Sequence, residues 1–222
     1  MIVLLFGPPG CGKGTQATSI ASRFHIPAIS TGEMFRAECK AGTSLGQAVS
    51  AILAKGGLVG DDIVNGIVRN RISQPDCRDG FLLDGYPRTV PQAQLLGQLL
   101  EEKGLPKPVV IHLDVPASAL VARLSARRQC PKCGRIYNVA SQPPRVEGRC
   151  DDDGAELARR DDDREEVILE RLKAYEALTG PVLQYYGAQG SHRIDGTRAP
   201  AEVFRDIEAL LQSAAPATSP RS

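Results

Sequence analysis

The feature that most constrains this chain is a glycine-rich segment directly after its first apolar run. Residues 2–6 are all apolar, and residues 7–15 that follow have the sequence GPPGCGKGT. An apolar run, a glycine-rich turn and a helix-like stretch together indicate a phosphate-binding loop, whose backbone N–H groups surround phosphate oxygens. Glycine permits this close approach because it has no Cβ, and Lys13 adds a positive charge for the β and γ phosphates. We expect nucleotide contacts from Gly10, Cys11, Gly12, Lys13, Gly14 and Thr15.

Strand-like and helix-like stretches alternate along the rest of the chain. Near-continuous apolar runs predict strands at 2–6, 81–83 and 109–115, with shorter candidates at 27–29 and 192–194. Helix-like stretches cover 14–23, 61–72, 91–102, 117–126, 163–187 and 200–211. Apolar runs without polar alternation are typical of parallel strands that are buried on both faces. The predicted fold class is therefore α/β, a P-loop parallel sheet with helices on both faces.

Two segments interrupt this alternation. Residues 30–59 are polar and rich in glycine, and residues 126–163 combine clustered Cys, Pro, Gly and Asp with little helical pattern. We interpret both as small lid domains inserted into a core of residues 1–29, 60–125 and 164–212. The low-complexity residues 213–222 are predicted to be a disordered tail.

Charge and hydropathy exclude several classes of function. The formal net charge is +1, which gives no general attraction to nucleic acid or to an anionic membrane. No apolar run approaches the roughly 18–20 residues that span a bilayer, and no basic segment precedes residues 2–6 as in a signal peptide. We therefore expect a cytoplasmic protein without a membrane or nucleic-acid partner, in which the six cysteines are thiols or metal ligands.

Further segments resemble the adenylate kinase family, a branch of the nucleoside monophosphate kinases. The matching segments are STGEMFR at 30–36, FLLDGYPRT at 81–89 and IDGT at 194–197, and the similarity extends from Met1 to about Leu211. The long second insert resembles the long-lid form of the family. This resemblance implies reversible, Mg²⁺-dependent phosphoryl transfer from ATP to AMP, giving two ADP, by a monomer that serves adenine nucleotide homeostasis.

The resemblance also implies residues for each nucleotide. The positions that match the AMP side are Thr31, Arg36, Gly57, Leu58, Val59, Gly85, Tyr86, Pro87, Arg88, Gln92, Arg160 and Arg171. The positions that match the ATP side, beyond the phosphate loop, are Arg127, Ile136, Tyr137 and Arg198. Gln92 corresponds to the residue that hydrogen-bonds adenine, and Asp84 to the residue that holds Mg²⁺ through water. Phosphoryl transfer needs in-line placement and charge neutralisation, for which Lys13, Arg88, Arg123, Arg160 and Arg171 are suited.

The second insert carries a cysteine pattern typical of a metal site. Cys130 and Cys133 form a Cys-x₂-Cys pair, Cys150 lies 17 residues beyond Cys133, and Asp153 follows three residues later. Three thiolates and one carboxylate suit a structural Zn²⁺ with four ligands. The resemblance favours Asp153 as the fourth ligand, while its neighbours 151 and 152 stay open as rivals if the second half of the site is distorted. Iron in place of zinc, or three free thiols without metal, are the remaining alternatives.

Two other functions compete with this interpretation. One is a kinase for a different monophosphate, such as UMP, CMP or GMP, because the choice of base depends on few contacts. The other is a nucleotide-regulated module that contacts nucleic acid through a zinc ribbon, although the aromatic content is only 5%. A switch GTPase is disfavoured because the sequence has no Asn-Lys-x-Asp motif.

Overall fold

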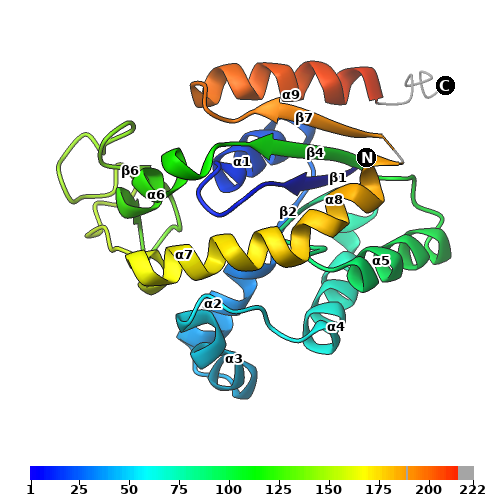
Figure 1. The fold of residues 1–222 in the computed structure, drawn as a ribbon, viewed down its shortest axis with the longest axis horizontal. Coiled ribbons are helices and arrows are strands. Elements are labelled where there is room, and N and C mark those ends of the chain that lie inside the picture. The colour runs from blue at the N-terminus through cyan, green and yellow to red at the C-terminus, as the bar shows by residue number, and fades with distance from the viewer. Residues whose placement is uncertain (189, 215–222) are drawn as a thin grey trace.

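A five-stranded parallel sheet lies at the centre of this computed structural model, which describes residues 1–188 and 190–214. The strands, in their order across the sheet, are β2 (Ala28–Ser30), β3 (Phe81–Asp84), β1 (Ile2–Phe6), β4 (Val109–Asp114) and β7 (Ser191–Asp195). Every neighbouring pair is parallel, and Figure 1 shows the sheet between layers of helices. The α/β fold expected from the sequence is confirmed.

The residues of β1 alternate between two separate apolar clusters. Ile2, Leu4 and Phe6 belong to a cluster on one face of the sheet, whereas Val3 and Leu5 belong to a cluster on the other. Successive side chains of a strand point to opposite faces, so a strand covered on both sides must be apolar throughout. This is why the run at residues 2–6 shows no polar alternation.

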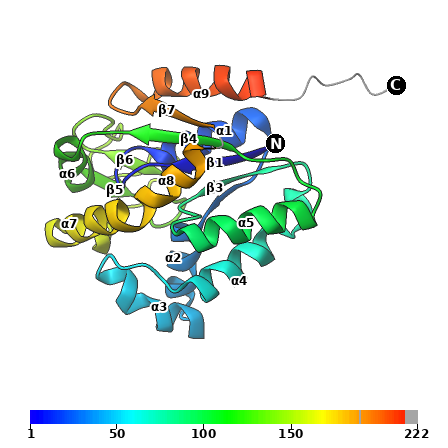
Figure 2. The same cartoon turned by 45° about the vertical axis from the view of Figure 1, so that its right-hand side comes forward.

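Helices cover both faces of the sheet (Figures 1 and 2). Helices α1 (Lys13–Phe24) and α9 (Pro200–Ala214) pack together over one face. Helices α4 (Asp61–Ile72), α5 (Val90–Glu102) and α8 (Gly180–Gly187) contribute to the cluster on the opposite face. The remaining core elements are α6 (Ala117–Ser125), α7 (Glu165–Ala174) and the short turn η1 (Pro75–Cys77).

The long helix expected at 163–187 is interrupted. After the 3₁₀ turn η2 (Asp161–Asp163), α7 leads into a π-helical segment, η3 (Tyr175–Thr179), and then into α8. Pro181 lies in the first turn of α8 and has no N–H with which to continue the α-helical hydrogen bonds. The wider π turn accommodates this missing donor, and such turns often lie at functional sites.

The insert at residues 30–59 contains two helices that pack closely. They are α2 (Thr31–Ala41) and α3 (Ser44–Ala54). The hydroxyl of Thr43 accepts a hydrogen bond from the N–H of Gly46 and thereby caps α3. A Cβ on Gly46 would collide with the backbone carbonyl of Glu38, so the absence of a side chain permits this packing.

The insert at residues 126–163 contains two short strands that the sequence did not predict. Strands β5 (Arg127–Gln129) and β6 (Ile136–Asn138) form an antiparallel pair, and turns make up most of the remainder. Each strand is only three residues long, so no alternation of apolar and polar residues was available to indicate it.

Two further expectations need correction. Residues 213 and 214 belong to α9, so the predicted disordered tail begins too early, and its other residues, 215–222, lie outside the described residues. Strand β2 covers Ala28–Ser30 instead of 27–29.

No helix among residues 1–188 and 190–214 combines the length and apolar character needed to cross a membrane.

Candidate active site and metal centre

A cleft of about 1690 Å³ lies where strands β1 and β3 end and the two inserts meet the core. In parallel α/β sheets, ligands bind at the carboxyl ends of the strands. Predicted residues from distant parts of the chain line this one cleft. They are Lys13, Arg36, Asp84, Arg88, Arg123, Arg127, Arg160, Arg171 and Arg198.

The phosphate loop joins β1 to α1 in the conformation that its glycines allow. Gly7, Gly10 and Gly12 have φ values of 148°, 84° and 105°, which side chains rarely adopt. The Nζ group of Lys13 donates hydrogen bonds to the carbonyl oxygens of Gly7, at 2.6 Å, and Pro8, at 3.1 Å. The side chain of Cys11 is buried against Gly7, and its Sγ lies 3.8 Å from Nζ of Lys13.

A smaller hollow beside the cleft collects most of the residues assigned to AMP. Its lining includes Thr31, Gly57, Leu58, Val59, Gly85, Arg88 and Gln92. The buried amide of Gln92 is already engaged within the protein, because its Oε1 accepts from the N–H of Arg88 and its Nε2 donates to Asp61, both at 2.7 Å. Asp61 therefore fixes the orientation of Gln92, a role that the sequence motifs did not indicate.

Tyr86 and Pro87 line the large cleft, but the hydroxyl of Tyr86 points elsewhere. It donates a hydrogen bond to Oδ1 of Asn65 at 2.8 Å, and the side chain is only 2% exposed. Burial raises the pKa of Tyr86 well above its ordinary value. Its hydroxyl thus supports the wall of the cleft from the core side and is directed away from the cleft.

Arginines gather on the lid side of the cleft around two carboxylates. Arg127 and Arg171 both donate to Asp163, which is fully buried at 0% exposure. Arg160 donates to Glu33 at 2.7 Å, and Arg36 donates to the same carboxylate oxygen at 2.6 Å. Burial and the nearby charge of Arg127 lower the pKa of Arg160 to about 10. The carboxylate of Glu33 therefore pairs with Arg36 and Arg160, which the sequence analysis predicted to bind phosphate.

Arg123 and Arg198 connect the other side of the cleft to the loop after β7. Arg123 donates to the carbonyl oxygens of Gly196, at 2.8 Å, and Thr197, at 3.1 Å. Arg198 pairs with Asp206 on α9. Both guanidinium groups are thus held at the rim of the cleft, on the side predicted to receive ATP.

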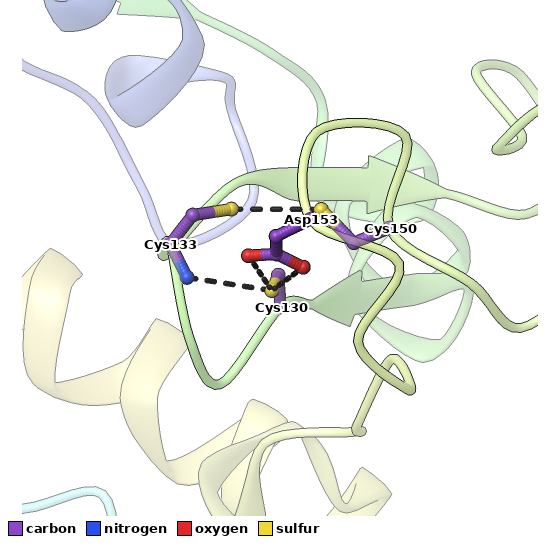
Figure 3. A group of neighbouring side chains, drawn as sticks. All are labelled: Cys130, Cys133, Cys150 and Asp153. Carbon is purple, nitrogen blue, oxygen red and sulfur yellow. Dashed lines mark hydrogen bonds between the residues drawn. The ribbon is translucent and has the colours of Figure 1, made fainter.

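The predicted metal ligands converge in the second insert (Figure 3). The ligand atoms of Cys130, Cys133, Cys150 and Asp153 all lie within 4.8 Å of one another. The Sγ atoms of Cys133 and Cys150 are 3.5 Å apart, close to the about 3.8 Å that tetrahedral Zn–S bonds of about 2.3 Å imply. Both carboxylate oxygens of Asp153 lie near Sγ of Cys130, at 3.4 and 3.3 Å. This donor set fits a structural zinc ion.

Comparison with known proteins identifies the family. A model described as "Adenylate kinase" matches residues 5–191. A protein of Syntrophomonas wolfei named adenylate kinase is 49% identical over 96% of this chain and 100% of its own length. Proteins of the same name from Carboxydothermus hydrogenoformans and Methanococcoides burtonii are 49% and 47% identical, over 96% and 93% of this chain and 100% and 96% of their own lengths.

The chain belongs to the adenylate kinase family.

Membership of the adenylate kinase family confirms the predicted class of enzyme, a nucleoside monophosphate kinase that converts ATP and AMP reversibly into two ADP. Adenylate kinases use Mg²⁺ together with ATP. The resemblance to this family, which the motifs indicated, is confirmed over nearly the whole chain.

Sequence motifs did not reveal the roles of three polar side chains in this adenylate kinase site, those of Glu33, Asp61 and Gln129. Glu33 is separated from Arg160 by 127 residues, and Gln129 also donates to Glu33, at 3.5 Å. Asp61 is separated from Gln92 by 31 residues. Contacts over such distances leave no periodic pattern in a sequence, and only the three-residue spacing of Glu33 and Arg36 gave a local signal.

Proposed function

We propose that this chain performs the adenylate kinase reaction in the cleft described above, with its lysine and arginines gathered around one continuous chain of phosphates. The observation that supports this proposal is that the phosphate loop and arginines of both inserts line a single cavity. Lys13 would bind the β and γ phosphates of ATP, Arg36 and Arg88 the phosphate of AMP, and Arg160 and Arg171 the phosphates of both. The rest of the ATP site would come from Arg127, Arg198 and the segment of Ile136 and Tyr137.

Phosphoryl transfer requires little covalent chemistry from the protein. The acceptor is a phosphate that is already ionised, so no general base is needed, and catalysis depends on in-line placement and neutralisation of equatorial charge. Mg²⁺, when bound with ATP, supplies further charge neutralisation, and Asp84 at the end of β3 would hold it through water. Arg123, held by the loop after β7, would complete the cluster of positive charge.

Substitution of Lys13 tests the phosphate assignment. Replacing one group that stabilises transition-state charge costs about 10²–10³-fold in kcat, so we expect a loss of at least this size in Lys13→Ala. Lys103→Ala is the matched control, because Lys103 is exposed at the end of α5. A folded Lys13→Ala protein that makes ADP from ATP and AMP at the parental rate would refute the proposal. The control protein should retain that rate.

The residue ranges 30–59 and 126–163 are proposed to be lids over AMP and ATP. Closure of both would exclude water, which otherwise competes with AMP as the acceptor. Support comes from contacts between the inserts, because Lys40 donates to the carbonyl of Pro131 at 3.1 Å and Arg160 pairs with Glu33. Scattering profiles that superimpose with and without a bisubstrate inhibitor would contradict lid movement.

Zinc is the proposed metal of the second insert. Three sulfur atoms and one carboxylate within 4.8 Å of one another suit Zn²⁺, and four protein ligands leave no open position for substrate. A small insert with few apolar residues would gain much of its folding free energy from such an ion. Metal analysis after purification without chelators should give about one Zn²⁺ per chain, since the cluster can hold one tetrahedral ion. Iron in its place, or no metal at all, would contradict this assignment.

The adenine of AMP is proposed to bind in the hollow around Gln92, and a single chain in the cytoplasm is the proposed working form. The hollow around Gln92 supports adenine recognition, and one chain supplies every residue named for the site. The balanced net charge of +1 supports the absence of nucleic-acid and membrane partners. A coupled assay with AMP, UMP, CMP and GMP as acceptors separates adenylate kinase from its nearest rivals, and sedimentation tests the monomer.

A further inference from the structure

The hydroxyl of Tyr137 lies inside the cysteine-rich insert, next to the metal ligands. Tyr137 is 4% exposed and forms a small buried cluster with Cys130 and Cys150. Its hydroxyl accepts a hydrogen bond from the N–H of Asp151 at 2.8 Å and donates one to Sγ of Cys150 at 3.5 Å. A backbone N–H can only donate, so the proton of the hydroxyl is available for the sulfur.

We propose that Tyr137 is a positioning residue for the metal centre, whose hydroxyl donates to the Cys150 thiolate and orients it toward the ion. This inference rests on the proposed zinc site. Hydrogen bonds from groups around a metal centre fix the orientation of its ligands and tune the electron density that they donate. A hydroxyl that donates to an anionic acceptor makes a strong bond of this kind.

The guanidinium group of Arg135 completes the arrangement around Tyr137. Its central carbon lies 5.0 Å from the centre of the Tyr137 ring, over which it stacks. The same guanidinium pairs with Asp151, at 3.6 Å, and with Asp152. These two carboxylates are therefore held on the outer side of the cluster.

Asp153 is oriented differently from its two neighbours. Its Oδ1 accepts a hydrogen bond from the N–H of Ala155 at 2.9 Å while the carboxylate faces the sulfur of Cys130. Oδ1 of Asp151 instead accepts from the N–H of Arg145 at 2.8 Å. Arg135 thus engages the carboxylates of Asp151 and Asp152, and Asp153 is the one of the three that faces the sulfur atoms.

Strand β6 connects this centre to the nucleotide cleft. Ile136 and Tyr137 are consecutive residues, so their side chains point to opposite sides of the strand. A Cβ placed on Gly14 of the phosphate loop would lie 3.3 Å from Cδ1 of Ile136, which places Ile136 directly over the first turn of α1. A metal that fixes Tyr137 would therefore also fix Ile136 on the ATP side of the cleft.

The test is Tyr137→Phe, compared with Tyr185→Phe. Both substitutions remove one hydroxyl. Tyr185, however, lies outside the insert and packs against the core cluster that contains Ile2 and Leu4 of β1. Loss of a hydrogen bond to a metal ligand typically lowers metal affinity about 10–100-fold, so we expect a decrease of that size for Tyr137→Phe by chelator competition. In Co²⁺-loaded protein the sulfur-to-cobalt charge-transfer band should move to longer wavelength, because the thiolate becomes more electron-rich. KM for ATP should rise more than KM for AMP.

The outcomes separate this inference from the zinc site itself. Wild-type chain that binds neither Zn²⁺ nor Co²⁺ would overturn both proposals. Wild-type and Tyr137→Phe proteins with equal metal affinity and identical cobalt spectra would overturn the positioning role alone.

A second variant covers the case in which Tyr137→Phe does not fold. Arg135 is 45% exposed, so Arg135→Gln is a surface substitution that releases Asp152. We expect Asp153→Asn to abolish metal binding in the wild-type background and to retain part of it in Arg135→Gln, where Asp152 can replace the lost ligand. Equal loss in both backgrounds would refute the role of Arg135 in choosing the ligand.

Discussion

The parallel-sheet core and the cysteine-rich insert at residues 126–163 are stabilised by different means. Strand β1 contributes every one of its residues to one of two large apolar clusters. The fully buried apolar cluster of the insert consists of Cys130, Tyr137 and Cys150, two of which are candidate metal ligands. The core thus depends on burial of apolar surface, which many residues share, whereas the insert buries few apolar residues and, with the proposed ion bound, would depend on the side chains that hold it.

Removal of the proposed zinc ion should produce the largest difference between the two regions. Structural zinc supplies about 10–16 kcal/mol in zinc-finger peptides, so a chelator should unfold the insert while the sheet persists. Cys130→Ser should have the same effect. Its melting temperature should fall clearly, whereas its kcat should change less. Amide hydrogen exchange measured residue by residue provides the test. Equal loss of protection in β1 and in β6 would show that the two regions are one cooperative unit.

Asp163 connects the two regions, and its substitution should have the second largest effect. Its fully buried carboxylate accepts from Arg127 of the insert and Arg171 of α7. Breaking a buried ion pair by neutralising one partner costs about 3–5 kcal/mol, because the partner charge stays buried without compensation. Asp163→Asn should lose about this much in urea unfolding. Asp161→Asn, at an exposed position of the same turn, should change stability by less than about 0.5 kcal/mol.

A substitution in the sheet should be smaller in effect and independent of metal. Ile111 lies in β4 and is 0% exposed, and removing one buried methylene from Ile to Val typically costs about 0.5–1.5 kcal/mol. Ile111→Val should lose this amount with and without chelator. Leu169→Ala on α7, where the side chain is 48% exposed, should cost far less. A metal-dependent loss at Ile111 would contradict the separation of core and insert.

These regions also differ in how well the sequence alone predicts them. The core could be predicted because its information is local: a strand buried on both faces must be apolar at each position, and a phosphate loop must have glycines at fixed spacing. Cys130, Cys133 and Cys150 were likewise visible as spacing, whereas the resemblance favoured Asp153 among three consecutive aspartates. Strands β5 and β6 were not visible, because the three residues of each carry no repeated pattern.

The direction of a side chain was the second kind of information that motifs could not supply. Tyr137 matches an ATP-side position of the family, yet its hydroxyl faces Cys150. Tyr86 lies within the family signature, yet its hydroxyl faces Asn65. A motif specifies which residue occupies a position, whereas the packing of the neighbouring elements determines where its polar atom points.

The contact between the two inserts at Glu33 should show the smallest effect and a dependence on pH. Burial acts to raise the pKa of Glu33, but the hydrogen bond from Arg36 and the charges of Arg36 and Arg160 outweigh it, so the pKa lies below its ordinary value. The ion pairs are consequently formed at any pH above the ordinary glutamate value of about 4.3. They are lost as the pH falls through the lowered value, when the carboxylate takes up a proton.

Glu33→Gln should remove this pH dependence at little cost in stability. The side chain is 47% exposed, and exposed ion pairs contribute about 0.2–1 kcal/mol, so global unfolding should change by no more than that. The Nε–H resonance of Arg160 should shift between pH 6 and pH 3 in the parent protein and stay nearly constant in Glu33→Gln. Glu101→Gln, at an exposed position of α5, should behave as the parent. If the Arg160 resonance titrates equally in all three proteins, then Glu33 does not hold the two inserts together, and other contacts, such as those of Lys40 with Pro131 and of α3 with η2, would have to do so.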